Sequence, residues 1–459
     1  MIALRSAHQP AVPGPRGSLL LGMAKQLQRD QLATLAQAAT EYGDVVRLIA
    51  GPPGRRVSLF LVSHPDGVQR VLTAGDTYTK GTPFYREIAA YFGDGVLTSG
   101  GQRWRRQRRT LAPLFTHRRT DRHVAAMAAE AERLVHRWSL AVGPPNVVDL
   151  HAELTDYTLR VVGRILFGAN VDDAIPVIRD AFPRLGEHVR RRARNPLRLP
   201  RNWPTRAQRR AAAAQRSLYQ VVESIIEQRH GVAGDEADLI SLLLAARDPH
   251  TGAPLSGAEI RDQVLTFLLA GHETTSTALS FTLHLLGHHP DLQRRVQREL
   301  DRVLGRRVPA VDDLAKLTYT TMVIKEAMRL YPPVPAVGRQ TPSGDHIGGY
   351  AIPPGSTVIL SPWITHRRPD LWAEPHQFNS DRFDPTAASE RHRYAYFPFA
   401  GGVRGCIGEH FAMTEAIVAT AALLNAYTLE TIPGPVALQA GLTLRPARPL
   451  QCQLTPRYA

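Results

Sequence analysis

The stretch that decides the fold is Phe397-Pro-Phe-Ala-Gly-Gly-Val-Arg-Gly-Cys-Ile-Gly-Glu-His-Phe-Ala412. Its cysteine, Cys406, stands among four glycines, which let the backbone pass close to something flat and bulky. Residues Glu409 to Leu424 have the pattern of a helix, so free N–H groups and a positive dipole end are expected just past Cys406. A thiolate supplied with such donors suits an axial ligand of iron. The plainer alternative is a small buried cysteine in a glycine loop.

The spacing Phe399-x-x-Gly402-x-Arg404-x-Cys406-x-Gly408 resembles the haem-binding signature of the cytochrome P-450 family, with every fixed position filled. The resemblance covers nearly the whole chain. It implies haem b with the Cys406 thiolate on its iron. It also implies the cytochrome P-450 fold, which is mainly α with a small β-sheet region, as one triangular prism-like domain over residues 1–459.

The amino-acid composition indicates the cellular compartment in which the protein works. The chain has 459 residues, is 43% hydrophobic and contains only two cysteines, Cys406 and Cys452, which excludes a disulfide scaffold and suits a reducing cytoplasm. Met1 to Pro15 has no signal pattern, and no run of about 18 apolar residues occurs, so no membrane span is expected. We therefore expect a cytoplasmic protein of bacterial type and, from the resemblance, a monomer.

The net charge of +15 is spread over several arginine clusters. Arg190 to Arg194 and Arg206 to Arg210 have no interleaved aromatic residues, so they favour a solvated surface and no nucleic acid is expected. A nucleic-acid or membrane-surface binder is the alternative. By resemblance, Arg103 to Arg109 with Arg118, Arg119 and Arg122 face the thiolate side, where an acidic ferredoxin or flavodoxin could dock. No reductase domain is expected after Cys406, so electrons would come from that carrier and its reductase.

Most periodic segments predict helices. Strands are expected at 45–50 and 57–62, within 350–362 and in pieces at 436–454, and an irregular segment is expected at 79–98. Helices are expected at 26–42, 66–72, 101–142, 148–167, 171–188, 207–229, 238–246, 257–289, 291–304, 318–330 and 409–424.

The helix at 257–289 carries polar residues in an apolar setting. Ser256 and Glu259 form a capping-box pattern at its start. In its middle, Ala270-Gly271-x-Glu273-Thr274 resembles the family's oxygen-activation motif. The resemblance implies that Gly271 opens a gap for dioxygen, that Thr274 hydrogen-bonds it and that Glu273 relays protons. The alternative is a helix cap or a threonine bonded back to its own helix.

Two further stretches lie before the cysteine. Glu326-Ala-Met-Arg329 and Phe378-Asn-Ser-Asp-Arg382-Phe383 match the family's pattern, except that Ser380 replaces the usual proline. The resemblance implies a buried network of Glu326, Arg329 and Arg382 that holds the cysteine loop. Removing one member should leave an unpaired buried charge.

The propionates of a haem need cationic partners. The resemblance places around the cofactor Lys80, Trp104, Arg108, Ala270, Arg339, Phe399, Arg404 and Gly408. It places around the substrate Phe84, Tyr85, Ile88, Phe267, Val334, Ala336 and Leu442.

The resemblance implies a monooxygenase of secondary metabolism that uses O₂ to hydroxylate a small apolar molecule. A terpenoid or another natural product is the first expectation, and a fatty acid is the alternative. A Cys-ligated haem electron carrier or sensor is the alternative from another class, and it would not need Gly271, Glu273 and Thr274.

Overall fold

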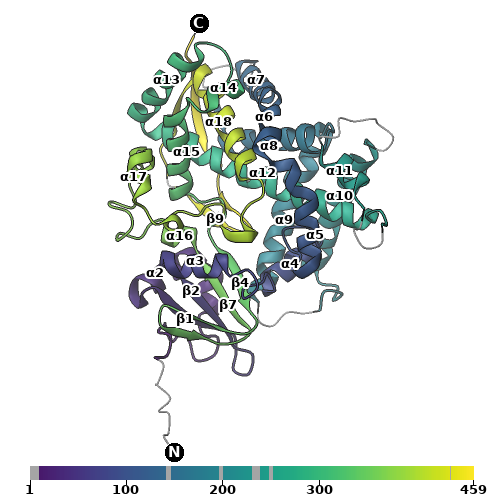
Figure 1. The fold of residues 1–459 in the computed structure, drawn as a ribbon, viewed down its shortest axis with the longest axis vertical. Helices are drawn as coiled ribbons and strands as arrows, with labels where there is room; N and C mark the ends of the chain where they lie inside the picture. The colour runs from purple at the N-terminus through teal and green to yellow at the C-terminus, as the bar shows by residue number, and fades with distance from the viewer. Residues whose placement is uncertain are drawn as a thin grey trace, which may run out of the picture.

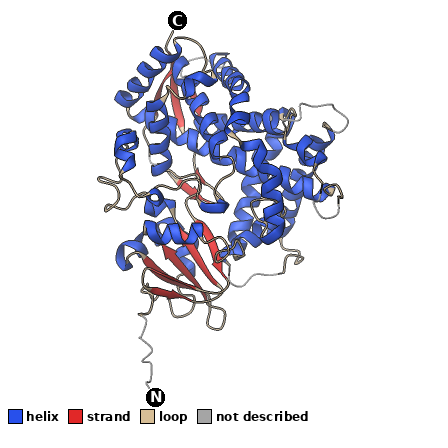
Figure 2. Cartoon of the chain, viewed as in Figure 1, coloured by secondary structure: helices blue, strands red, loops and turns tan. Residues whose placement is uncertain are grey.

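Helices make up most of the molecule and the strands are gathered in small sheets (Figure 2). The computed structural model describes residues 10–140, 146–195, 200–229, 238–247, 252–434 and 436–458. Within these residues the chain is mainly α with small β-sheets, as the sequence predicts.

The first eleven helices cover residues 24–245. They are α1 (Ala24–Arg29), α2 (Gln31–Tyr42), α3 (Pro65–Thr73), α4 (Pro83–Phe92), α5 (Gly101–Leu111), α6 (His117–Arg122), α7 (Val124–Leu140), α8 (Leu150–Val161), α9 (Ile175–Arg194), α10 (Arg206–Glu227) and α11 (Leu239–Ala245). After α8 the chain makes one π-helical turn, η2 (Val162–Leu166).

Seven more helices follow. They are α12 (Gly257–His288), α13 (Pro290–Leu304), α14 (Val311–Leu314), α15 (Thr318–Leu330), α16 (Pro362–Thr365), α17 (Pro385–Ser389) and α18 (Glu409–Ala426).

The largest sheet has four strands and lies at the lower end of the molecule in the view of Figure 1, beside α2 and α3. Its order is β1 (Val45–Ala50), β2 (Val57–Val62), β7 (Ser356–Leu360) and β4 (Val337–Thr341). β2 pairs in parallel with β7, and the other two pairs are antiparallel. The sheet thus joins the start of the chain to the segment after α15, which brings β4 toward the cysteine loop.

Three smaller sheets complete the strands. β3 (Val147–Asp149), β11 (Gln451–Pro456) and β8 (Tyr427–Thr431) form one; β9 (Leu438–Ala440) pairs with β10 (Leu444–Pro446), and β5 (Asp345–Ile347) pairs with β6 (Tyr350–Ile352).

The long helix α12 runs through the main hydrophobic core. Ser256 accepts a hydrogen bond from the N–H of Glu259, and the Glu259 carboxylate accepts from the N–H of Ser256, so the predicted capping box is confirmed. At about 1.5 Å per residue its 32 residues span about 48 Å. It packs on α8, α15 and α18. Residues near its middle therefore face the cysteine loop from the opposite side.

The prediction of an irregular segment at 79–98 is wrong. Helix α4 lies within it: Thr82 accepts a hydrogen bond from the N–H of Tyr85, and Pro83 takes the first helical position. Its aromatic side chains Tyr91 and Phe92 are buried. The segment forms a helix in place of the expected loop because one face of the helix is buried against the rest of the molecule.

Candidate active site

The cysteine loop has a constrained backbone. Ala400 has φ 59° and Gly402 has φ 63°, both in the left-handed region. A Cβ on Gly402 would lie 2.1 Å from the carbonyl oxygen of Leu72, so only glycine fits. The N–H of Cys406 donates to the carbonyl of Phe399 at 3.0 Å, which closes the loop on itself.

The thiol of Cys406 lines a cavity in the interior, and its surface is open to that cavity. Burial in the surrounding protein raises the pKa of the thiol, while the N–H of Gly408 and the charges of Arg108 and Lys80 lower it. The balance favours the protonated thiol. A metal ion bound at this sulfur would reverse it, because a coordinating thiol is deprotonated.

The cavity measures about 290 Å³ and lies between the cysteine loop and α12. Most of the predicted site residues line it: Lys80, Phe84, Tyr85, Ile88, Phe267, Ala270, Gly271, Thr274, Val334, Ala336, Arg339, Phe399, Arg404, Cys406, Gly408 and Leu442. Trp104, Arg108, Glu273 and the Glu326 network stand behind this wall. The structure thus brings together residues more than 300 positions apart.

Helix α12 presents Gly271 and Thr274 to the cavity. The Thr274 hydroxyl donates to the carbonyl of Ala270 at 2.7 Å, so the threonine does bond back to its own helix and its oxygen lone pairs stay available. A Cβ on Gly271 would lie 2.7 Å from Cγ2 of Val162 in the π-helical turn. The missing side chain of Gly271 therefore first serves the packing of α12 against η2.

Glu273 does not line the cavity, and its carboxyl lies near Thr443 and Arg445 in the hairpin of β9 and β10. Burial raises the pKa of its carboxyl, and the Arg445 charge and the Thr443 hydroxyl oppose that shift. Thr443 lines the cavity. Glu273 therefore keeps its proton to a higher pH than an exposed carboxyl does, and Thr443 lies between it and the cavity.

Three cations, Lys80, Arg339 and Arg404, line one edge of the cavity, and a fourth, Arg108, lies near them behind the wall. Burial, followed by repulsion from Arg339, Arg404 and Arg108, lowers the pKa of Lys80 well below its usual range. Burial first, and then repulsion from Arg339, lowers the pKa of Arg404 to about 10. Arg339 is 3% exposed.

Within the described residues, none of these four cations pairs with a carboxylate. Lys80 donates to the carbonyl of Leu97 at 2.8 Å, Arg339 to that of Gly338 at 2.9 Å and Arg404 to that of Ser99 at 2.9 Å. Arg404 also stacks on the Trp104 ring at 3.8 Å. Buried cations without counter-charge are costly. A flat ligand bearing two carboxylates would offset that cost, so the residues present fit a haem whose propionates lie at this edge.

The predicted Glu–Arg–Arg network forms behind the cysteine loop. Glu326 and Arg329 are both fully buried and make a bidentate pair, with N···O distances of 2.7 and 2.9 Å. Arg382 approaches Glu326 at 3.5 Å from Nε to Oε1 and donates to the carbonyl of Glu374. Ser380, in place of the usual proline, donates its hydroxyl to Tyr319 at 2.9 Å. The departure from the family pattern leaves the network intact.

A histidine that the sequence reasoning missed connects this network to the cysteine loop. Arg329 donates to the carbonyl of His366 at 2.8 Å, and Nε2 of His366 accepts from the N–H of Phe397 at 2.9 Å. Burial lowers the pKa of His366 well below its usual range, so the ring stays neutral and can accept. His366 stands in no motif that indicates this role, because the role depends on a hydrogen bond to Phe397, which lies 31 residues away in the sequence.

Other lining residues were also missed, among them Phe115, Leu166, Met328 and Thr443. They carry no motif, and only the packing of α12 on its neighbours brings them to the cavity. Phe115, for example, stacks on Phe267 at 5.3 Å.

Known proteins resemble the chain over its whole length. The family model for cytochrome P450 matches residues 12–451. Cyclooctatin synthase of Streptomyces melanosporofaciens is 36% identical over 94% of both chains, and cyclooctat-9-en-7-ol 5-monooxygenase of the same organism is 33% identical over 99% of this chain and 98% of its own. Pentalenene oxygenase of Streptomyces avermitilis is 33% identical over 95% of this chain and 96% of its own.

The haem domain of cytochrome P450DA superposes with a TM-score of 0.86 at 29% identity, covering 98% of both chains. Among the described residues, no helix is long and apolar enough to cross a membrane. The fold, the cysteine loop and these matches agree, and the chain belongs to the cytochrome P450 family of monooxygenases.

Proposed function

We propose that this protein is a single-domain haem-thiolate monooxygenase that hydroxylates an apolar terpenoid. One atom of O₂ enters a substrate C–H bond and the other is reduced to water. The observation that carries the substrate class is the cavity wall. Away from the cation edge it is made of apolar side chains with Tyr85, Thr274, Thr275 and Thr443 as the polar groups, and no carboxylate among the described residues lines it. Three relatives with names of terpenoid chemistry support the same class.

The haem, when bound through Cys406, supplies the iron that activates O₂. The chain's own residues would hold it, with Lys80, Arg108, Arg339 and Arg404 supplying positive charge for its propionates and the Glu326 network supporting the loop. Thr274 is placed to hold a proton at its hydroxyl on the opposite face. We infer that Glu273 supplies protons from the Thr443 side, because burial raises the pKa of its carboxyl toward the range in which general acids work.

A fatty acid is the second candidate, favoured by one observation. A second cavity of about 200 Å³ shares Phe84, Ala336 and Leu442 with the first, and Arg194 lines its outer part. Burial lowers the pKa of Arg194 to about 10, and this residue makes hydrogen bonds to Leu27 and Gln31 without a carboxylate partner in the described chain. It could take the carboxylate of a chain-like acid.

Binding titrations distinguish the two. Substrate entry changes the haem absorption spectrum, so a panel of cyclic terpene hydrocarbons and alcohols can be compared with saturated fatty acids on the wild type and on Arg194→Gln. We expect terpenoids to give a saturable spectral change, and we expect the affinity measured from it to be the same in Arg194→Gln as in the wild type. Fatty-acid binding that exceeds terpenoid binding and is lost in Arg194→Gln would replace the terpenoid with the second candidate.

The electron donor is proposed to dock on the thiolate side. Helix α6 packs on α18, with the rings of His117 and His410 3.8 Å apart, so α6 lies beside the cysteine loop. Arg109, Arg118 and Arg122 are exposed there and have no ion-pair partner among the described residues. This positive surface suits an acidic ferredoxin or flavodoxin.

Charge reversal tests the docking surface. Arg118→Glu and Arg122→Glu should raise the KM for the carrier and reduce its salt dependence, whereas Arg216→Glu on α10, a helix on another face, should not. Equal effects of all three substitutions on the KM for the carrier would contradict docking on this surface.

A further inference from the structure

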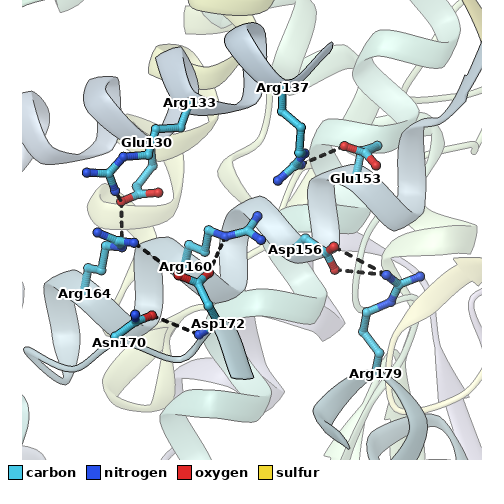
Figure 3. A network of polar contacts seen from close by, with 10 residues as sticks. All are labelled: Glu130, Arg133, Arg137, Glu153, Asp156, Arg160, Arg164, Asn170, Asp172 and Arg179. Atoms are coloured by element: carbon cyan, nitrogen blue, oxygen red, sulfur yellow. Dashed lines mark hydrogen bonds and ion pairs between the residues drawn. The ribbon is translucent and has the colours of Figure 1, made fainter. Parts of the chain in front are cut away.

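A surface hollow of about 320 Å³ lies between α7, α8 and the π-helical turn η2, apart from the haem site. Four arginines line it from three elements, Arg133 and Arg137 from α7, Arg160 from α8 and Arg164 from η2, and Figure 3 shows these side chains with their ion pairs. Each pair is four residues apart, so two guanidinium groups share one helix face and repel each other. Two such pairs face each other across the hollow.

The side chains that line the hollow carry more positive than negative charge. The four arginines face the carboxylates of Glu130 and Asp172. Arg160 meets Asp172 at 2.7 Å, and Arg164 meets Glu130 at 2.9 Å and Asp172 at 3.3 Å.

The remaining two arginines also have carboxylate partners, and one of these partners, Glu130, lines the hollow itself. Arg133 bonds Glu130, and Arg137 meets Glu153 at 2.7 Å behind the wall. A guanidinium has five N–H donors. Among the described residues, each of these four arginines uses one or two of its N–H groups on protein acceptors, so the others are available to a ligand.

Two buried polar atoms at the hollow have no partner among the described residues. The Tyr157 hydroxyl is one, on a side chain that is 1% exposed, and Oε2 of Glu130, on a residue 4% exposed, is the other. Burial, together with Glu415 and Glu130, raises the pKa of Tyr157 well above its usual range, so its hydroxyl keeps its proton and can donate. Tyr157 therefore needs an acceptor and Glu130 needs a donor, and native proteins rarely leave such groups unpaired.

We propose that this hollow binds inorganic phosphate in a protonated form. Its anionic oxygens accept from Tyr157 and from the unused N–H groups of the arginines, and its P–OH group donates to Oε2 of Glu130. One ligand thus satisfies both unpaired buried atoms and offsets the excess positive charge. A volume of about 320 Å³ is at the small end of ligand sites, which suits a small anion.

Glu130 makes the site selective for anions that carry a proton. Sulfate has the same shape but carries no proton near neutral pH, so its oxygens would meet the Glu130 carboxylate with no hydrogen bond between them. A phosphate monoester, whose second pKa is about 6, has the required proton in slightly acidic solution and largely lacks it above pH 7. A phosphodiester never has it, so the backbone of a nucleic acid does not qualify.

The test is calorimetric titration of the purified holoenzyme with inorganic phosphate at pH 7 and constant ionic strength, beside sulfate and methyl phosphate. The variants are Arg160→Gln and Tyr157→Phe. The matched control is Arg179→Gln, because Arg179 on α9 pairs with Asp156 at 3.3 Å on the same face without lining the hollow (Figure 3). Thermal unfolding and the haem spectrum of each variant verify that it is folded.

We expect one phosphate per chain in the wild type and in Arg179→Gln. Affinity should fall about tenfold or more in Arg160→Gln and in Tyr157→Phe, since each loses a hydrogen bond to a charged group. Sulfate should give no saturable heat, and methyl phosphate should bind better at pH 6 than at pH 8, which separates it from inorganic phosphate as the source. Equal binding of sulfate and phosphate, binding unchanged in both hollow variants, or no binding of phosphate would overturn the proposal, the last leaving water as the partner of Tyr157 and Glu130.

Discussion

Replacement of Glu326 by glutamine tests the buried network behind the cysteine loop. Arg329 has no exposed surface and directs its N–H groups at the Glu326 carboxylate and at three carbonyl oxygens, those of His366, Pro375 and Gln377. Glu326→Gln keeps the volume but removes the nearby negative charge and presents an amide N–H₂ to the guanidinium. The variant therefore leaves a buried cation without its counter-charge.

Breaking such a pair costs about 3–5 kcal/mol. The entropy of unfolding near 60 °C is about 2.1 cal/mol/K per residue, so for 459 residues it is about 1 kcal/mol/K. The apparent Tm should then fall by about 3–5 °C in calorimetry. The haem content of the purified protein should fall as well, because the network reaches Phe397 through His366.

Asp291→Asn is the matched control. Asp291 and Arg294 are also three residues apart on one helix, but their side chains are 90% and 60% exposed. An exposed pair contributes at most about 1 kcal/mol, so this Tm should move by about 1 °C or less. If Glu326→Gln behaves like Asp291→Asn and keeps its haem, the buried network does not hold the loop.

Three other perturbations follow from the site. Thr274→Ala should lower the fraction of electrons that reach product while leaving the spectrum of the reduced, CO-bound protein intact, because the role we propose for the hydroxyl is proton supply and not haem binding; unchanged coupling would count against that role. Arg404→Met should weaken haem binding about tenfold or more and leave the apoprotein as stable as before or more so, since it relieves repulsion among buried cations; an apoprotein Tm that falls with unchanged haem affinity would show that Arg404 is structural. Glu415 is fully buried with both oxygens unpaired among the described residues, and burial raises its pKa well above the usual value. The charged form is disfavoured in the folded state, so stability is greatest below the unfolded pKa of about 4.3 and falls as pH rises toward the folded pKa; the Tm advantage of Glu415→Gln over wild type should therefore grow between pH 5 and pH 8, and a constant difference would refute this.

Local signals made much of the fold predictable. Val45–Ala50 and Val57–Val62 are strands at the predicted bounds, because a turn of glycine and proline separates two apolar runs. The helix expected at 26–42 is interrupted, since Asp30 caps a new helix by accepting from the N–H of Ala33. β4 was missed because its pairing with β7 lies 15 or more residues away and its sequence, Val337–Thr341, has little strand pattern of its own.

As with the fold, one part of the candidate site could be predicted from sequence motifs and another part could not. Cys406, Glu326, Arg329 and Thr274 stand in motifs that local spacing reveals. The partners that give them their chemistry do not: His366 joins the network through a carbonyl and a ring nitrogen, and Thr443 and Arg445 reach Glu273 from the far end of the chain. Such contacts depend on tertiary packing, which single-sequence patterns do not encode. Tyr157 and the arginines that line the hollow between α7 and α8 are also brought together by tertiary packing.

The central claim is that Cys406 binds haem iron as a thiolate. The most direct measurement is the absorption spectrum of the reduced, CO-bound protein, because thiolate ligation shifts the Soret band far to the red. We expect that shift in the wild type and its loss in Cys406→Ser. A wild-type protein that takes up haem but shows no red-shifted band, or one whose band survives in Cys406→Ser, would contradict the account.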